Sequence, residues 1–208
     1  MCRAQFDHLV VGIRSLPEGI AEFARLTGVT PGVGGKHPGR GTENALVSLG
    51  GGSYVEILAP QPGATLSVAD EGLRKLEHLR IVDWAVSVSG VEAGIETLRG
   101  AGFAVELVRP GSRVAPSGER LEWTTFDLAD PSLSMAPFCI HWSPGTVHPS
   151  TNAPGGCALT GLTVQDRAPD RLAAALNALA VEGIAYATGA PRIEARLTCG
   201  DKSVTLST

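Results

Sequence analysis

Residues 34–60 combine a histidine, closely spaced glycines, an asparagine and a glutamate within a single short stretch. Glu56 is the unusual member, because its neighbours (YVEIL, residues 54–58) predict a strand packed in a core. An unpaired carboxylate in such a place would cost several kcal/mol. Glu56 must therefore face a hydrogen-bond donor, a cation or a metal ion. We expect His37 and Asn44 to lie at the rim of the same site.

Two further histidines occupy strands at comparable positions. Alternation places His8 opposite the face of residues 6–13 that a helix covers. In residues 136–142, alternation places His141 and Cys139 on one face and Phe138, Ile140 and Trp142 on the other. Two histidines and one carboxylate are typical ligands of mononuclear Fe(II), and they suit Zn(II), Mn(II) or Ni(II). We therefore predict that His8, Glu56 and His141 hold one divalent metal ion.

Simpler interpretations of the same residues stay open. His8 alone would be a satisfied core histidine, and Glu56 alone would pair with Arg40 or Arg113. His37 is either an exposed loop residue or a proton shuttle beside a ligand. The cup would then hold its ligand without a metal.

A second group of residues is expected to bind the ligand. It consists of polar and aromatic side chains that surround the site: Asn44, Tyr54, Trp84, Arg113 and Trp123. Arg113 would anchor an anion. His78 and His148 fall in connecting segments and are predicted to be solvated. No phosphate loop is present, since His37 follows Gly35-Lys36, and no nucleotide cofactor is expected.

These residues are carried by a repeated pattern of elements. A strand at residues 6–13 precedes a helix opened by a capping box (Ser15, Glu18), and further strands follow up to residue 60. The pattern returns at residue 83 with a second capping box (Ser89, Glu92). The predicted fold is α+β: two tandem βαβββ modules that form a cupped, half-open mixed barrel with helices outside. A third, partial module follows.

The modules are bounded by changes in composition. We predict a first module at residues 1–60, a connector at 61–79 and a second module at 80–143. The glycine- and proline-rich residues 144–156 form a linker, and the C-terminal module covers residues 157–208. This last module has no histidine or glutamate where the first has Glu56, which predicts a structural role.

Composition excludes several classes of protein. The chain has 208 residues, 43% hydrophobic content and a net charge of −4 with no basic run, so neither nucleic acid nor an anionic membrane is an expected partner. The four cysteines (Cys2, Cys139, Cys157 and Cys199) have unrelated spacings, which favours reduced thiols in a cytoplasmic protein. No signal-peptide pattern opens the sequence.

Three segments resemble one family: DHLVVGI at the start, GGKHPGRGTENALVSLGGGSYVEIL, and SRVAPSGERLEW with PFCIHW. They are similar to the vicinal-oxygen-chelate superfamily (glyoxalase, bleomycin resistance, extradiol dioxygenase), in its glyoxalase-like domain branch, over residues 5–143. The resemblance implies metal ligands at His8, Glu56 and His141. A fourth ligand is absent, because Val82 or Trp84 stands at its place, and this departs from glyoxalase I.

Two functions follow from this resemblance. The first is a small-molecule enzyme, a lyase, isomerase or dioxygenase, in which a metal chelates neighbouring substrate oxygens and Glu56 and His37 are catalytic. The second is a non-catalytic protein that sequesters an antibiotic or toxin in a cup lined by Tyr54, Trp84 and Trp123. Modules of this superfamily often pair across dimers, so one expectation is a homodimer. The alternative is that the third module already covers the exposed sheet edge.

Overall fold

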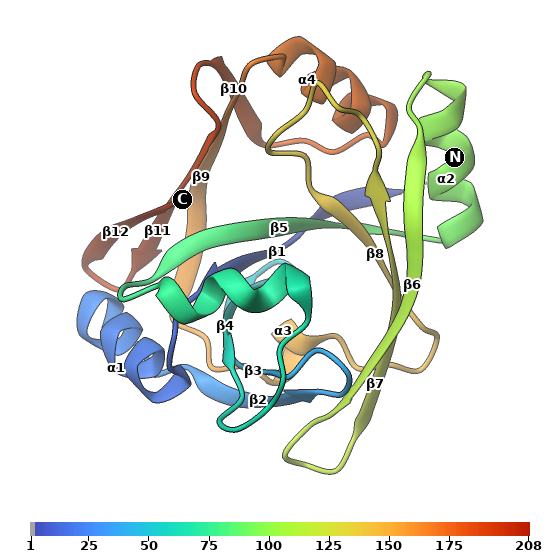
Figure 1. The fold of residues 1–208 in the computed structure, drawn as a ribbon. Helices are drawn as coiled ribbons and strands as arrows, with labels where there is room; N and C mark the ends of the chain where they lie inside the picture. Colours follow the sequence, from blue (N-terminus) through green and yellow to red (C-terminus); the bar gives the residue numbers. More distant parts are fainter. Residues whose placement is uncertain (1–2) are drawn as a thin grey trace.

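The computed structural model describes residues 3–208, and Figure 1 shows their arrangement. The first module contains β1 (Ala4–Gly12), α1 (Leu16–Thr27), β2 (Gly32–His37), β3 (Thr42–Gly50) and β4 (Ser53–Pro60), and the 3-10 helix η1 (Val68–Lys75) follows. The second contains β5 (Arg80–Val88), α2 (Val91–Gly100), β6 (Val105–Val114), β7 (Arg120–Leu128) and β8 (Phe138–Trp142). The rest comprises α3 (Pro149–Asn152), β9 (Cys157–Asp166), α4 (Pro169–Ala178), β10 (Ile184–Thr188), β11 (Arg192–Cys199) and β12 (Lys202–Ser207).

The strands of the first two modules form one closed barrel, in the order β1-β4-β3-β2-β6-β7-β8-β5. β1 pairs in parallel with β4 and antiparallel with β5, so the first strands of the two modules lie side by side. On the far side, β2 meets β6 through one residue pair, Lys36 and Val114. The predicted α+β class with tandem βαβββ modules is confirmed, and the barrel is closed where a half-open cup was expected.

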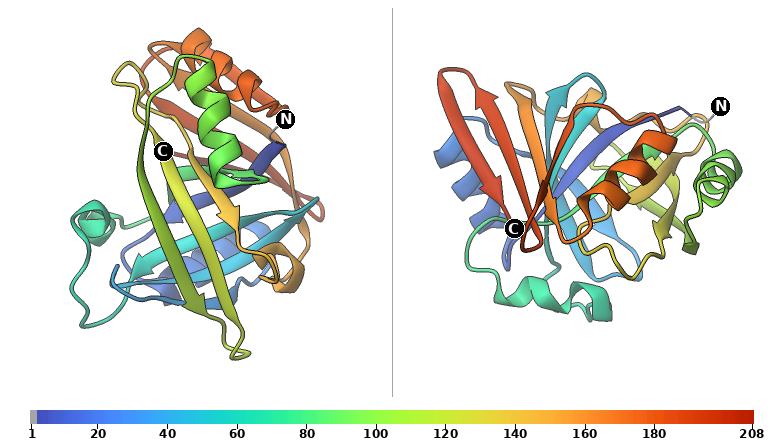
Figure 2. Two further views of the ribbon diagram at one scale, coloured as in Figure 1. Left: turned by 90° about the vertical axis from the view of Figure 1, so that its right-hand side faces the viewer. Right: turned by 90° about the horizontal axis from the view of Figure 1, so that it is seen from above.

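The main hydrophobic core lies outside the barrel. Leu9 and Val11 of β1 are fully buried in this core, whereas His8 and Val10 face the barrel interior. The helices and a second sheet, ordered β10-β9-β11-β12, cover the outer surface. Figure 2 shows this sheet beside α1, on the side of the barrel away from η1. The inner face of each strand is thereby left available for a binding site.

The helix starts differ from the predicted capping boxes. Ser15 is the N-cap of α1 but makes no side-chain cap hydrogen bond, and Glu18 instead accepts a hydrogen bond from Arg14 at 3.1 Å. At α2 the N-cap is Gly90, and the hydroxyl of Ser89 accepts a hydrogen bond from the backbone of Arg3. The helices lie where they were expected, but packing of their apolar faces rather than capping determines their position.

The predicted linker at residues 144–156 is packed against the barrel. It contains the short helix α3, and the backbone of Ser48 in β3 donates a hydrogen bond to the carbonyl of Pro154 at 2.8 Å. His148, predicted to be solvated, is partly buried and bonds to Asp7 of β1 at 3.1 Å. His78 is exposed, as predicted.

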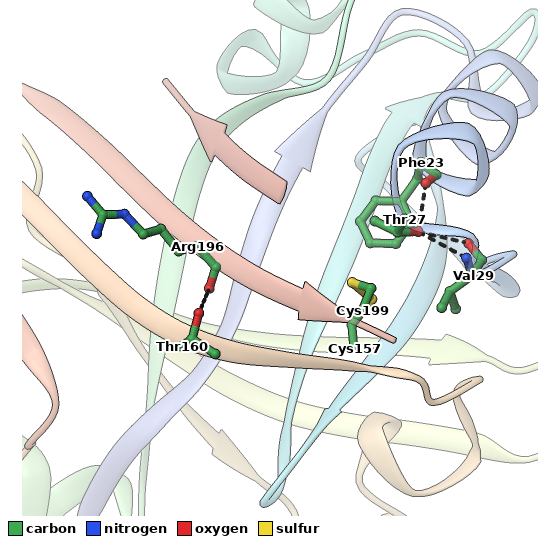
Figure 3. The surroundings of a disulfide bond; sticks show 7 residues. All are labelled: Phe23, Thr27, Val29, Cys157, Thr160, Arg196 and Cys199. Carbon is green, nitrogen blue, oxygen red and sulfur yellow. Dashed lines mark hydrogen bonds between the residues drawn. A yellow bond between two sulfur atoms is a disulfide. The ribbon is translucent and has the colours of Figure 1, made fainter. Parts of the chain in front are cut away.

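A disulfide joins Cys157 and Cys199, so the prediction of reduced thiols is wrong for this pair. The two residues are register partners in β9 and β11, and Figure 3 shows the bond beside the end of α1, near Phe23 and Thr27. Cys139 is buried in the core, and Cys2 lies outside the described residues. The disulfide removes the argument for a reducing compartment. Among residues 3–208, no helix is long and apolar enough to cross a bilayer.

Reduction of this disulfide should destabilise the protein. The bond closes a loop with a sequence separation of 42 residues, and a loop of that size corresponds to at most about 4 kcal/mol of restricted unfolded-chain entropy. We expect dithiothreitol, or the double substitution of both cysteines by alanine, to lower the melting temperature. Intact mass under non-reducing conditions gives the oxidation state independently. An unchanged melting temperature after verified reduction would contradict the prediction.

Candidate functional site

The barrel encloses a cavity of about 930 Å³ lined by the inward-facing side chains of all eight strands and by η1. Seven of the predicted site residues line it: His8, His37, Asn44, Tyr54, Glu56, Arg113 and Trp123. The first module supplies His8, His37, Asn44 and Glu56. The second module contributes the aromatic residues Trp123, Phe138 and Trp142, together with polar and aliphatic side chains.

His141 does not face the cavity, and this part of the predicted ligand set is wrong. Cys139 is fully buried in the outer core, and His141 lies on the same face and contacts the carbonyl of Val88 at 3.1 Å. Phe138, Ile140 and Trp142 are the cavity-facing residues of β8. The sequence-based prediction exchanged the two faces of β8. A shift of one residue in the alternation moves every side chain of a strand to the opposite face.

Trp84 is also outside the cavity. Its side chain is fully buried in the outer core, and its indole donates a hydrogen bond to the carbonyl of Met135 at 2.9 Å. Its neighbour Asp83 faces the cavity instead, since it is the register partner of the cavity-facing Val10. Sequence reasoning compared only Val82 and Trp84 at this position and so missed Asp83.

Glu56 lies at the centre of the polar end of the cavity. Its Oε1 accepts a hydrogen bond from the Asn44 amide at 2.6 Å, and it is 3.6 Å from His37 Nε2. Its Oε2 is 3.8 Å from His8 Nε2. Burial raises the pKa of Glu56, but the two imidazoles and the amide outweigh that effect and hold the pKa below its usual value. The buried carboxylate is therefore charged, as is expected for a carboxylate with such neighbours.

The imidazole of His37 is held at both nitrogens. Its Nδ1 is 3.0 Å from the hydroxyl of Thr42, and its Nε2 is 3.3 Å from the Asn44 amide nitrogen. Because that amide nitrogen is a donor, Nε2 accepts and Nδ1 donates to Thr42. Burial lowers the pKa of His37, against the opposing attraction of Glu56. His37 is thus a buried residue, not an exposed loop histidine.

His8 is oriented by its sequence neighbour Asp7. The Nδ1 of His8 lies 2.6 Å from Asp7 Oδ1. Asp7 is a carboxylate, so Nδ1 carries a proton, and Nε2 faces Glu56. A register irregularity between Phe6 and His8 lets the two neighbours meet. Tyr54 stacks on the His8 ring with a centroid distance of 4.5 Å.

Asp7 belongs to the candidate site, and sequence reasoning missed it. It is fully buried, and its Oδ2 accepts from Trp142 Nε1 and His148 Nε2, each at 3.1 Å. Burial alone would raise its pKa, but hydrogen bonds from His148 and His8 lower the pKa to about 2. The sequence did contain a signal for this residue: an aspartate stands directly before a strand histidine, inside an apolar run. Burying that aspartate without a partner would cost as much as burying Glu56.

Glycines make room for the polar cluster. A side chain at Gly34 would place its Cβ 2.3 Å from Asn44 Oδ1, and one at Gly35 would place it 2.6 Å from the carbonyl oxygen of Val114. Gly35 also has a φ of 142°, which favours glycine. The glycine-rich stretch therefore allows β2 to approach β6 closely and leaves space for Asn44.

The remaining charges of the cavity are mostly paired. Arg40 bonds to Asp70 at 2.6 and 3.0 Å, and Arg109 bonds to Asp127 at 2.7 Å. Asp83 is accessible from the cavity but surrounded by protein, and this burial, with the nearby charge of Asp127, raises its pKa to about 6. Among the described carboxylates that line the cavity, Glu56 and Asp70 thus have lowered pKa values and Asp83 has a raised one.

The described residues do not fit the expected divalent metal ion. Within residues 3–208, no group of three or more His, Cys, Asp or Glu side chains is arranged to hold one. The Nε2 atoms of His8 and His37 are nearest to different oxygens of Glu56, at 3.8 and 3.6 Å, and neither contact is within ligand distance of a shared ion. The amide of Asn44 donates a hydrogen bond to Glu56 Oε1, which occupies one of the two carboxylate oxygens.

The fold and the site define a class of protein: a closed barrel of paired βαβββ modules around an acidic and imidazole-lined cavity. The family model of the glyoxalase-like domain matches residues 6–180. The chain belongs to this family, within the vicinal-oxygen-chelate superfamily. Among curated proteins, no significant match was found.

Solved structures share this architecture. A hypothetical protein from Staphylococcus aureus is similar with a TM-score of 0.64 at 14% identity, over 98% of this chain and 85% of that one. A methylmalonyl-CoA epimerase from Mycobacterium tuberculosis is similar with a TM-score of 0.47 at 18% identity, over 67% of this chain and 88% of that one. The first similarity extends over nearly the whole chain, so the fold that includes the C-terminal sheet also occurs elsewhere.

Replacement of Asp7 by asparagine should destabilise the protein in a pH-dependent way. The pKa of Asp7 is about 2 when folded and 3.8 in the reference state. A lowered pKa stabilises the folded state above pH 4, by about 2 kcal/mol, and this contribution is lost as the pH falls toward 2. The difference in unfolding free energy between wild type and Asp7→Asn, measured by urea denaturation, should shrink by about half from pH 7 to pH 3. A difference that is independent of pH would argue against a charged Asp7.

Proposed function

We propose that this protein is an enzyme that transfers a proton on a small, oxygen-rich organic molecule held in the barrel cavity, with His8 and Glu56 as the proton-transfer groups. The observation that carries the proposal is the pair of atoms His8 Nε2 and Glu56 Oε2, which lie 3.8 Å apart at the cavity wall. Glu56 Oε2 accepts hydrogen bonds, and the Nε2 atom of a neutral imidazole does so as well. Their natural complement is a ligand group with an acidic hydrogen.

The two groups are suited to different parts of such a transfer. Glu56 is a charged carboxylate that accepts a proton from the ligand. His8 is held in one orientation by Asp7, whose negative charge stabilises the imidazolium that forms when Nε2 takes up a proton. A group of this kind, positioned next to its substrate, typically accelerates proton transfer by about a hundredfold to ten-thousandfold. His37, which faces the other oxygen of Glu56, would deliver or remove the proton from that side.

The walls of the cavity are compatible with a small organic ligand. Trp123 and Trp142 pack edge to face with 5.5 Å between their ring centroids. The ring centroids of Trp123 and His37 are 6.2 Å apart. Gly111 permits this arrangement, because a Cβ there would lie 2.3 Å from Trp123 Nε1. The cavity volume of about 930 Å³ is within the range of small-molecule sites.

A second candidate function is sequestration of a small molecule without chemistry. It is favoured by the aromatic side chains Tyr54, Trp123, Trp142 and Phe138, which line the cavity and supply stacking surface. The two candidates differ in one respect: a sequestering protein binds its ligand without exchanging the ligand's protons with solvent.

Exchange of carbon-bound protons in D₂O separates the two functions. The protein is incubated with a panel of 1,2-dicarbonyl compounds and α-hydroxy carbonyl compounds, and loss of the α-proton signal is followed by ¹H NMR. We expect exchange catalysed by the wild type and reduced by about a hundredfold or more in Glu56→Gln and His8→Gln. His141→Gln serves as the matched control, because this histidine lies outside the cavity.

Each variant is first checked for an unchanged circular dichroism spectrum. Retention of full exchange in the Glu56 and His8 variants would overturn the proposed roles. Tight binding without exchange for every ligand that binds would favour sequestration.

A further inference from the structure

Three arginines of the described chain line the cavity, and they differ in whether a carboxylate pairs with the guanidinium. Arg40 is held by Asp70 through two hydrogen bonds, and Arg109 is held by Asp127. Both guanidinium groups are therefore neutralised by carboxylates of the protein, and both are about half exposed.

Arg113 has no such partner. Within residues 3–208, no carboxylate lies within 4.0 Å of its guanidinium, although the residue is only 4% exposed. Its hydrogen bond in this part of the chain runs from Nη1 to the carbonyl oxygen of Gly34. A guanidinium carries five N–H donors, so most of its donor capacity remains available. Burial lowers the pKa of Arg113, which shows the cost of placing this charge in the barrel wall.

A purely structural role explains only part of this arrangement. The bond from Arg113 to Gly34 spans the junction of β6 and β2, where the barrel closes through a single residue pair. One neutral donor would suffice for that bond. A buried cation that is matched only by a backbone carbonyl is costly unless an anion arrives from elsewhere.

The surroundings of Arg113 favour an anion with one negative charge. Glu56 attracts the Arg113 guanidinium electrostatically, and Asp83 faces the same cavity. A dianion would be repelled by these carboxylates, whereas a monocarboxylate would balance the one unpaired cation. The planar fork of a guanidinium also matches a carboxylate with two parallel hydrogen bonds.

We propose that the cavity binds a small α-oxygenated monocarboxylate whose carboxylate group pairs with Arg113. This inference rests on the proposed function for the role of the remaining atoms of the ligand. A carboxylate on Arg113 places those atoms in the same cavity as Glu56, which takes up a proton from the adjacent carbon.

Matched charged and neutral ligands test the proposal without any turnover. Lactate and glycolate are compared with lactamide and glycolamide, and inorganic phosphate provides a further anion, all by NMR titration of ¹⁵N-labelled protein. We expect the wild type to bind the carboxylates at least roughly tenfold more tightly than their amides, and Arg113→Gln to lose about tenfold to hundredfold in carboxylate affinity. Arg113→Lys, which keeps the positive charge, should retain part of the carboxylate affinity. Arg109→Gln is the matched control, since its charge is already paired with Asp127.

The outcomes separate this inference from the proposed function. Equal affinities for carboxylates and amides in the wild type, or a loss in Arg109→Gln that Arg113→Gln does not show, would overturn it. Phosphate binding stronger than carboxylate binding would also overturn it. Carboxylate binding that depends on Arg113, with no proton exchange in D₂O, would support the anion site and reject the enzyme. Proton exchange on ligands that bind equally well as acid and as amide would support the enzyme and reject the anion site.

Discussion

The site depends above all on one buried carboxylate, that of Asp7. Three N–H donors from different parts of the chain converge on it: His8 beside it in β1, Trp142 at the end of β8, and His148 in the segment before β9. A carboxylate with no exposure is tolerated only when such donors are present. The first module, the second module and the connection to the third are therefore joined at the point that orients His8.

The overall fold could be predicted from the sequence, because it depends on local patterns that repeat. Which face of β8 points into the cavity could not be predicted from the sequence, because the cavity face is not polar: it carries the aromatic residues Phe138 and Trp142. Hydrophobic alternation distinguishes a core from water, but it does not distinguish a core from an aromatic-lined cavity. His141 was misplaced for this reason. The disulfide of Cys157 and Cys199 was missed because only the pairing of β9 with β11 brings the two residues together.

Within the first module, the site residues were found because each was hard to explain otherwise. Glu56 and His8 interrupt apolar strands, and the structure places both in the cavity. Asp7 interrupts the same strand but was missed, since simple alternation has no place for an irregular register. The cost of burying a charge was therefore a better guide to this site than the spacing of ligand residues.

The cavity holds carboxylates in different electrostatic surroundings. Glu56 is kept charged by imidazoles and an amide, whereas Asp83, on the neighbouring module, has a pKa raised to about 6 by burial. Two carboxylates whose surroundings push their pKa values apart are the usual basis for separate base and acid roles. Arg113 adds a cation that no carboxylate of the described chain balances. Glu56, Asp83 and Arg113 thus come from strands that local sequence patterns place in the same barrel.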